Sequence, residues 1–266
     1  MKGLNGKSAI VTGGSRGIGK SVVERLLEEG VKVLFCGRNE KTGQTTLDAF
    51  SKKYGDKVAF TACDMEDRDT PQTLIARGRS LFGELDFLVN NAFPFTAKAI
   101  DATYEDWIHT FMAGPAAYAR MIAEFATQRR KKEGAIVCVS SISAHIAQPK
   151  RWTYNAAKGA VKQLIRCAAL DLAPAIRVNC VSPGWVKTDE VLKATPQKSW
   201  ESTPKAWEEY HILQKLQEPE QIASSVAFLL SDDASAITGH DLFADSGYLA
   251  MGPEGLGKTA SFAGSE

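Results

Sequence analysis

Short apolar runs rich in β-branched residues alternate along this chain with longer stretches of helical periodicity. Strands that are joined through helices can lie parallel in one sheet, and continuous apolarity is typical of strands that are covered on both faces. The alternation therefore predicts an α/β fold with a seven-stranded, mainly parallel sheet and helices on both faces. The runs expected to form the strands are 8–12, 31–36, 58–62, 87–90, 135–139, 176–180 and a last one near 241–244.

Composition narrows the class of protein. A chain of 266 residues is long for an average domain, but α/β folds often use this length in a single domain. The formal net charge of +1 gives no reason to expect a nucleic acid or a membrane as partner. The chain has no signal-like start, no spanning apolar run, no C-x-x-C and no metal-ligand spacing of histidines. We expect a cytoplasmic protein with free thiols, no metal and a small-molecule substrate.

A glycine-rich segment, Thr12-Gly-Gly-Ser-Arg-Gly-Ile-Gly19, lies between the first expected strand and the helix that follows it. Glycine allows positive φ and a close approach of the backbone to a ligand, and a helix N-terminus offers free N–H donors. In this context the segment predicts a loop that binds the pyrophosphate of a dinucleotide. The alternative is a purely structural turn.

The end of the second expected strand indicates which dinucleotide is bound. A carboxylate at this place binds the ribose 2′-hydroxyl of NAD, whereas an arginine accommodates the 2′-phosphate of NADP. The chain has Gly37-Arg38-Asn39 and no acid, and Arg16 can approach the same corner. Two guanidinium groups favour NADP, with NAD less favoured. Asp64, after the third expected strand, could bind the adenine amino group or simply cap a helix.

Tyr154 and Lys158 stand four residues apart, so they lie on the same face of a helix. An ammonium group beside a phenol stabilises the phenolate and lowers the tyrosine pKa. The pair is therefore a candidate acid/base unit. The alternative is two exposed side chains on a helix surface.

Taken in order along the chain, these motifs resemble those of the classical short-chain dehydrogenases/reductases, from about residue 6 to 250. The matching segments are 12–19, Asn90-Asn91-Ala92, Ser140-Ser141, Tyr154-x-x-x-Lys158, Pro183-Gly-Trp-Val-Lys-Thr188 and Ile237-Thr-Gly239. The resemblance implies a doubly wound, Rossmann-type sheet and hydride transfer with a nicotinamide cofactor. It also implies a homo-oligomer, either a homotetramer or a dimer, built through helices near 103–131 and 152–173.

The resemblance further implies a catalytic set of Ser141, Tyr154 and Lys158, with Ser141 thirteen residues before Tyr154. Tyr154 would exchange a proton with the substrate oxygen, Lys158 would lower the tyrosine pKa and bind the nicotinamide ribose, and Ser141 would orient the substrate. The cofactor-binding residues implied are Gly13, Ser15, Arg16, Gly17, Ile18, Gly19, Arg38, Asn39, Asp64, Met65, Asn91, Ala92, Tyr154, Lys158, Pro183, Gly184, Val186 and Thr188. Asn90 would tie the fourth strand to its neighbours.

Two positions depart from the family pattern. Phe93 follows Asn-Asn-Ala where the family usually has glycine, and Gly114 stands where the family generally has a helix asparagine. That asparagine holds a water in a proton relay behind the lysine. Gly114 and Pro115 can preserve the helix kink without the side chain. We hypothesise that the relay runs through backbone and water alone. Faster turnover of Gly114→Asn would support a weakened relay, whereas a dead variant would mean that the site is filled differently.

The expected substrate pocket contains Phe93, His145 and Trp185, with Phe95 and Trp152 either in the pocket or packed in the core. Aromatic side chains favour a ring-bearing or apolar secondary alcohol or ketone. The predicted function is hydride transfer between NADP(H) and such a substrate. One alternative is a nucleotide-binding sensor or scaffold with weak activity, motivated by the two departures. The other is an enoyl or dienoyl thioester reductase.

No internal repeat or linker-like break interrupts the chain before its end. We therefore expect one dinucleotide-binding catalytic domain over residues 1–251. Within it, residues 189–217 carry aromatic, charged and proline residues, and we interpret them as a helical substrate lid. Residues 252–266 contain several glycines and serines, which is typical of a C-terminal tail.

Overall fold

A single parallel sheet of seven strands organises the part of the chain that the computed structural model describes, residues 1–128 and 133–257. Its order is β3-β2-β1-β4-β5-β6-β7, and each neighbouring pair is parallel. The chain winds outward from β1 in both directions, so the predicted doubly wound fold is confirmed. The strands are β1 (Ser8–Val11), β2 (Lys32–Gly37), β3 (Val58–Ala62), β4 (Phe87–Asn90), β5 (Gly134–Val139), β6 (Ile176–Pro183) and β7 (Asp241–Ala244).

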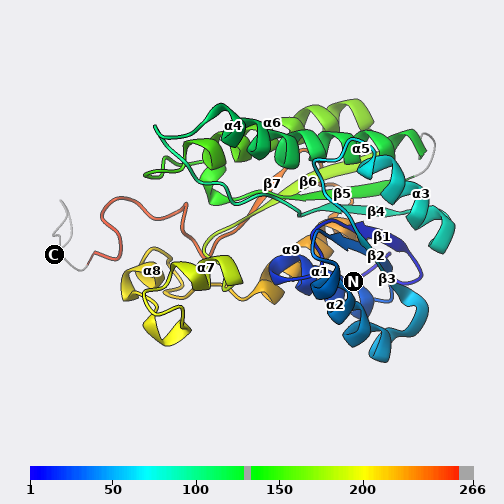
Figure 1. Ribbon diagram of the computed structural model, residues 1–266, viewed down its shortest axis with the longest axis horizontal. Helices are drawn as coiled ribbons and strands as arrows, with labels where there is room; N and C mark the ends of the chain where they lie inside the picture. The colour runs from blue at the N-terminus through cyan, green and yellow to red at the C-terminus, as the bar shows by residue number, and fades with distance from the viewer. Residues whose placement is uncertain (129–132, 258–266) are drawn as a thin grey trace.

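Helices cover both faces of this sheet (Figure 1). They are α1 (Gly17–Glu28), α2 (Glu40–Tyr54), α3 (Thr70–Phe82), α4 (Tyr104–Phe111), α5 (Ala117–Gln128), α6 (Trp152–Leu172), α7 (Asp189–Ala194), α8 (Lys205–Glu209) and α9 (Pro219–Leu230). The short turns between them are η1 (Gly55–Lys57), η2 (Met112–Ala116), η3 (Ile142–Ala144), η4 (Trp200–Ser202) and η5 (Asp232–Ala234). In the described residues no helix is long and apolar enough to cross a bilayer.

Side chains point alternately to the two faces of the sheet along each strand, and this divides the core into two layers. Ala9 and Val11 of β1 pack on the side of α1 and α9, whereas Ile10 between them packs on the side of α3, α5 and α6. Successive residues of a strand point to opposite faces, so each strand must be apolar throughout when helices cover both faces. The continuous apolar runs of the sequence are explained by this burial. They also leave the strand ends as the place for polar chemistry.

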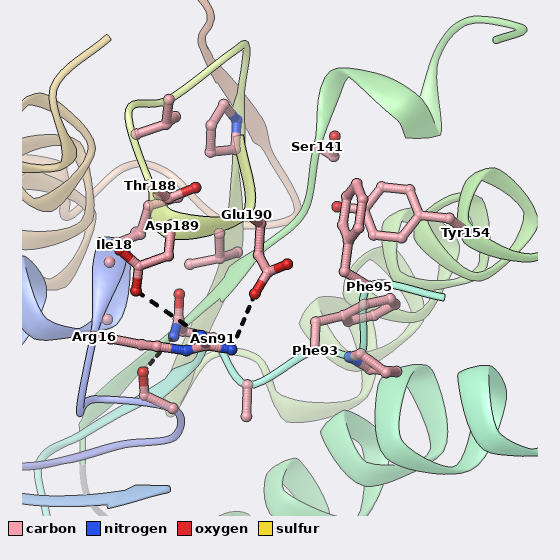
Figure 2. Close-up of a pocket in the computed structure, with 18 of the residues that line it drawn as sticks. Arg16, Ile18, Asn91, Phe93, Phe95, Ser141, Tyr154, Thr188, Asp189 and Glu190 are labelled. Carbon is pink, nitrogen blue, oxygen red and sulfur yellow. Dashed lines mark hydrogen bonds and ion pairs between the residues drawn. The ribbon is translucent and has the colours of Figure 1, made fainter. Parts of the chain in front are cut away.

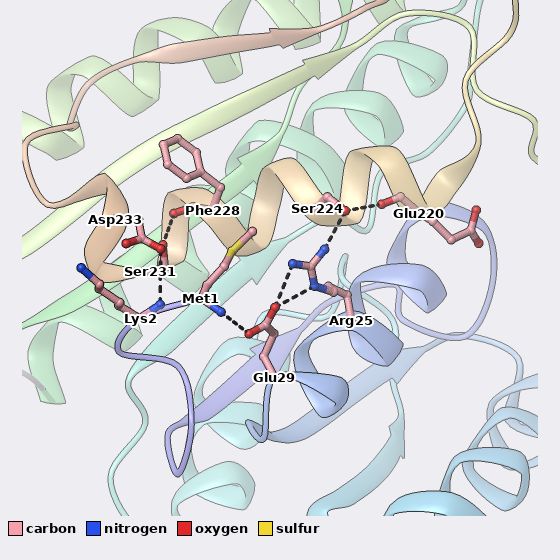
Figure 3. Close-up of polar contacts among 9 residues, drawn as sticks. All are labelled: Met1, Lys2, Arg25, Glu29, Glu220, Ser224, Phe228, Ser231 and Asp233. Atoms are coloured by element: carbon pink, nitrogen blue, oxygen red, sulfur yellow. Dashed lines mark hydrogen bonds and ion pairs between the residues drawn. The ribbon is translucent and has the colours of Figure 1, made fainter.

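Polar contacts at the surface hold α1 against α9 (Figure 3). The guanidinium of Arg25 donates to Glu29 at 2.8 Å and to the Ser224 hydroxyl at 2.7 Å, and Glu29 also accepts from the amino group of Met1 at 2.6 Å. Such partly exposed ion pairs contribute little individually. They join α1 and α9, which pack on the face of the sheet opposite α6.

The segment after β6 carries the short elements α7, η4 and α8, which lie together at one end of the molecule (Figure 1). After β7 the chain continues through turns over residues 252–257. The rest of the predicted tail, residues 258–266, lies outside the described residues.

Candidate active site

A cavity of about 580 Å³ opens along the carboxyl ends of the central strands. The glycine-rich loop after β1 lines one end of it, and Tyr154 and Lys158 of α6 line the other. All the residues predicted to bind the cofactor, and Ser141, lie around this one cavity. Open α/β sheets place ligands at this edge, because loops from strands on both sides of the winding point meet there.

The glycines after β1 suit no side chain, because each has a positive φ, a neighbour too close to a Cβ, or both. Gly13 has a φ of +68° and Gly17 a φ of +53°, which L side chains rarely adopt. A Cβ at Gly13 would lie 2.9 Å from the Cα of Ala92, and one at Gly19 would lie 2.1 Å from the carbonyl oxygen of Gly13. The bare backbone beside the N-terminus of α1 therefore forms a cradle that fits a dinucleotide pyrophosphate.

Hydrogen bonds fix this loop to the end of β4. The Thr12 hydroxyl accepts from the backbone N–H of Asn91 at 3.0 Å and of Ala92 at 3.1 Å. The Asn91 amide in turn donates to the carbonyl oxygens of Thr12 and Gly13 at 3.0 and 3.1 Å. Asn90 is buried behind the loop and donates to the Tyr118 carbonyl at 3.3 Å. It ties β4 to α5, as the resemblance implied.

Two arginines approach the expected ribose corner, but they are placed differently. Arg38, directly after β2, lines the cavity. Arg16 lies across from α7 and forms ion pairs of 3.9 Å with Asp189 and 3.2 Å with Glu190 (Figure 2). The side chain of Arg16 is 55% exposed, so these pairs are weak and a phosphate can compete for the guanidinium.

Local hydrogen bonds hold the two polar residues that were predicted beside the arginines. The Asn39 side chain caps α2 by accepting from the Thr42 N–H at 2.8 Å. The Asp64 carboxylate accepts from the Glu66 N–H at 3.0 Å. Asp64 does not cap the helix that follows it, because α3 begins at Thr70 after Asp69. Both Asn39 and Asp64 line the cavity, so these local bonds are compatible with contact to a ligand.

At the other end, the end of β5 and α6 bring Ser141 and Tyr154 together (Figure 2), and Lys158 of α6 lines the same cavity. Ser141 begins η3, and its hydroxyl accepts from the Ser143 N–H at 3.1 Å. Lys158 is buried, and its ammonium donates to the Val139 carbonyl at 2.9 Å. A hydroxyl, a phenol and an ammonium therefore face the same space.

Burial governs the ionisation of this pair. It raises the pKa of Tyr154 to about 12, against smaller lowering effects of the Ser141 hydroxyl and the Arg151 charge, and it lowers the pKa of Lys158 to about 7. The expectation that Lys158 would lower the pKa of Tyr154 is therefore corrected. The Lys158 ammonium is 3.6 Å from the Phe93 ring centroid and 5.6 Å from that of Tyr154. The lysine charge thus lies on the phenylalanine ring rather than at the phenol.

Aromatic rings wall the reaction end, as predicted for Phe93 and Trp185. The ring of Phe95 lies 5.0 Å from that of Tyr154 between centroids, and it also lines the cavity. Trp185 lines the cavity and packs on Trp207 at 4.7 Å. Of the two roles left open for Phe95, pocket or core, the structure favours the pocket, because Phe95 lines the cavity and is 50% exposed.

Two predicted pocket residues do not line the described cavity. The Nε2 atom of His145 is 2.7 Å from the Asp241 carboxylate, and the Lys162 ammonium donates to its Nδ1 at 3.1 Å. These two charged groups hold the imidazole against β7. Trp152 is 54% exposed, because it stands two residues before Tyr154 and so points to the opposite side of α6.

Sequence reasoning missed several side chains of the cavity. Ser143, Gln148 and Arg151 line the reaction end, and the Ser143 hydroxyl donates to Gln148 at 2.6 Å. The carbon of the Arg151 guanidinium is 5.5 Å from the Phe95 ring centroid and 5.9 Å from that of Trp185. The position of Arg151, three residues before Tyr154, was a usable signal, since this spacing places two residues on one helical face. Over the described ranges, no three His, Cys, Asp or Glu side chains could hold a metal.

Comparisons with known proteins agree with this arrangement. A family profile described as "Enoyl-(Acyl carrier protein) reductase" matches residues 13–249. A chloroplastic tropinone reductase homolog of Arabidopsis thaliana is 34% identical over 250 residues, covering 92% of this chain and 76% of that protein. Sorbose reductase of Schizosaccharomyces pombe is 33% identical over 256 residues, covering 93% and 98%.

A solved structure gives the same result in three dimensions. L-sorbose reductase of Gluconobacter frateurii, complexed with NADPH and L-sorbose, superposes with a TM-score of 0.88 at 27% identity, covering 93% of this chain and 98% of that one. The similarity extends from the glycine loop to the last strand. With this agreement of motif order, strand order and overall sequence, the chain belongs to the classical short-chain dehydrogenases/reductases.

Proposed function

We propose that the protein transfers a hydride between NADP(H) and a secondary alcohol or ketone that carries a ring or another apolar group. The observation that carries this proposal is the convergence of the glycine loop with Ser141, Tyr154 and Lys158 on one cavity. The bound cofactor supplies the hydride chemistry. The side chains of the protein supply a proton and hold the substrate oxygen.

The ionisation of Tyr154 suits a proton donor. With a pKa raised to about 12, the phenol keeps its proton at neutral pH and can donate it to a carbonyl oxygen during reduction. The Ser141 hydroxyl, at the same end of the cavity, orients that oxygen. In the oxidative direction the phenol must first lose its proton, and the Ser141 hydroxyl and the Arg151 charge, which both lower the Tyr154 pKa, favour that loss.

NADP is the proposed cofactor because of the two arginines at the ribose corner. Arg38 lines the cavity at the end of β2, where no carboxylate stands to compete. Arg16 can exchange its exposed ion pairs for a phosphate. The structure of the related L-sorbose reductase contains NADPH, which supports the same choice.

The substrate class rests on the aromatic walls. Phe95 and Trp185 offer ring faces to a ligand whose oxygen reaches Tyr154. Relatives named for tropinone and sorbose act on carbonyl or alcohol groups, which supports the reaction class. We propose that residues 189–217, which follow Thr188 at the cavity, form the lid over this substrate.

The second candidate is an enoyl thioester reductase, because the matching family profile carries that description. The pairing of Ser141 with Tyr154 favours carbonyl chemistry, since it places two hydroxyl groups where one substrate oxygen would bind. A nucleotide-binding sensor needs no such pair. The three candidates therefore differ in what they do with NADPH.

The deciding experiment follows NADPH and NADH oxidation with a panel of ring ketones, ketoses and an enoyl thioester. We expect turnover with a ring ketone and NADPH, and a loss of about 10²- to 10⁴-fold in kcat for Tyr154→Phe. Tyr54→Phe, on α2 and outside the lining of the cavity, is the matched control and should retain full activity. Turnover of the thioester alone would establish the second candidate. Nucleotide binding without any turnover would establish the sensor.

We also propose a cytoplasmic homo-oligomer. Large apolar side chains are exposed on α4 and α6, among them Tyr104, Ile108, Trp152 and Leu170. Several large apolar side chains exposed on neighbouring helices are typical of contacts between subunits. Light scattering coupled to gel filtration measures the assembly, and a monomer at micromolar concentration would contradict the proposal. Free thiols at all five cysteines suit a reducing compartment.

A further inference from the structure

The ammonium of Lys158 is buried with few groups that stabilise its charge. The side chain is 2% exposed, and its hydrogen bond to the Val139 carbonyl uses one of three N–H donors. Within the described ranges no carboxylate forms an ion pair with this ammonium. A buried charge in this position requires a further partner.

The ring of Phe93 is that partner. The Lys158 ammonium lies over the ring, 3.6 Å from its centroid, and the negative face of an aromatic ring attracts a cation. Two edge-to-face contacts orient the ring, with centroid distances of 5.8 Å to Tyr118 and 5.7 Å to Tyr154. Phe93 therefore contacts both members of the acid/base pair.

The outer end of the Phe93 ring lies against Gly114. This residue sits in the π-helical turn η2, before Pro115, with φ of −103° and ψ of −110°. A Cβ at Gly114 would lie 2.8 Å from the Cζ atom of Phe93 and 2.9 Å from Cε2. The kink expected from Gly-Pro is present, but an asparagine at this position would displace the ring. Of the two outcomes open for Gly114→Asn, this contact favours a loss of turnover, with the space filled by the Phe93 ring.

We propose that Phe93 is a positioning residue for Lys158 and that Gly114 makes room for the Phe93 ring. Phe93 and Gly114, the two departures from the family pattern, then form one matched pair. The ring occupies the space behind the lysine that a side chain at position 114 would need. An aromatic face stabilises the ammonium where polar groups would otherwise do so. The inference rests on the proposed function only in its activity measurement.

The other titratable groups around Lys158 keep their protons at neutral pH. Burial raises the pKa of Cys138 in β5 to about 12, and it raises the pKa values of Cys180 in β6 and Tyr118 in α5. Tyr154 in α6 is raised in the same way. A titration near neutral pH at this place therefore reports on Lys158, and removal of the ring face must lower its midpoint because the charged form loses its partner.

The first test is a titration of the cofactor-free protein by NMR of ¹³C-labelled lysine, with Lys158→Met to assign the signal. In Phe93→Leu, which keeps apolar volume but has no aromatic face, we expect the Lys158 midpoint to fall by about 0.5 to 1 pH unit. The high-pH limb of kcat/KM should move to lower pH by the same amount. An unchanged midpoint overturns the proposal. Since this titration requires no substrate, it remains informative if the proposed activity is wrong.

The second test is a double-variant cycle, which measures whether the effect of Gly114→Ala on kcat/KM depends on the Phe93 ring. Gly114→Ala should reduce kcat/KM by about tenfold or more in the native background, but by less than about threefold in the Phe93→Ala background. Gly159→Ala is the matched control, because a Cβ at that α6 glycine meets nothing within 4 Å, and its effect should be equal in both backgrounds. Failure of Gly114→Ala to fold except together with Phe93→Ala supports the pair. Equal losses from Gly114→Ala in both backgrounds overturn it.

Discussion

The nucleotide end of the cavity is formed mainly by backbone atoms, whereas the reaction end is formed by side chains. At the nucleotide end, backbone atoms of Gly13 and Gly19 approach neighbouring backbone so closely that a Cβ would collide with it. At the reaction end, side chains such as Phe93 and Lys158 contact one another across separate elements. A backbone cradle tolerates no substitution, whereas side chains can be replaced when a neighbour compensates. Substitutions at the two ends should therefore differ in kind.

The largest loss of NADPH affinity is expected at Gly19, where a side chain would disrupt the backbone cradle most directly. A Cβ there would lie 2.1 Å from the Gly13 carbonyl oxygen, and no rotamer change can move a backbone atom. We expect Gly19→Ala to cost about 3 kcal/mol of binding, or about 100-fold in the Kd of NADPH. Isothermal titration calorimetry measures it.

Gly159→Ala provides the control for that substitution. Its Cβ would meet no atom of the same subunit within 4 Å, and Gly159 lies outside the lining of the cavity, so NADPH affinity should remain within about twofold. If Gly19→Ala binds NADPH as tightly as the native protein, the loop has another binding conformation and the cradle argument is wrong.

A smaller loss of NADPH affinity is expected where the adenosine ribose would bind, because there side chains, and not the backbone, line the nucleotide end. Arg38→Ala removes the guanidinium that we propose contacts the 2′-phosphate, so we expect NADPH affinity to fall by about 10- to 100-fold and NADH affinity to stay constant. Arg16→Ala should lose less, because its guanidinium also pairs with Glu190. Arg166→Ala, exposed on α6 and outside the lining of the cavity, is the control. Equal losses for the two nucleotides would mean that Arg38 does not read the phosphate.

The same difference explains what could be predicted from sequence. The strands and the glycine loop follow from local rules, since apolar runs, φ preferences and strand–loop–helix order are properties of neighbouring residues. The helix face shared by Tyr154 and Lys158 is equally local. The contact of Phe93 with Gly114 is not, because it joins the loop after β4 to a kink beyond α4. Two departures that the sequence shows separately become one feature only in three dimensions.

A substitution of Arg151 shows whether the reaction end prefers a negatively charged substrate. Its guanidinium stacks near Phe95 and Trp185, and among the residues described no carboxylate pairs with it. A ring ketone with a carboxylate should therefore be preferred over its methyl ester. We expect Arg151→Gln to reduce that preference, measured as the ratio of kcat/KM values, by about tenfold. Lys150→Gln, the exposed neighbouring cation, should leave the ratio unchanged, and an equal change there would point to bulk charge instead.

The smallest effect concerns the wall of the reaction end, which depends on a buried histidine. The Nε2 atom of His211 accepts from the Trp185 N–H at 3.3 Å, and Nδ1 is 2.9 Å from the Trp207 carbonyl. Only the neutral ring, with its proton on Nδ1, satisfies both contacts. Burial lowers the pKa of His211 below its ordinary value of 6.5.

A histidine with a lowered pKa stabilises the fold fully above about pH 6.5 and loses that contribution as pH falls through the folded-state value. We expect His211→Gln to lower the free energy of unfolding by about 1 kcal/mol at pH 7.5 and by less at pH 5. Urea denaturation of both proteins at the two pH values isolates this residue, since the remaining histidines are common to both. If the difference between the proteins is the same at both pH values, His211 is not held neutral, and the position of Trp185 does not depend on its protonation.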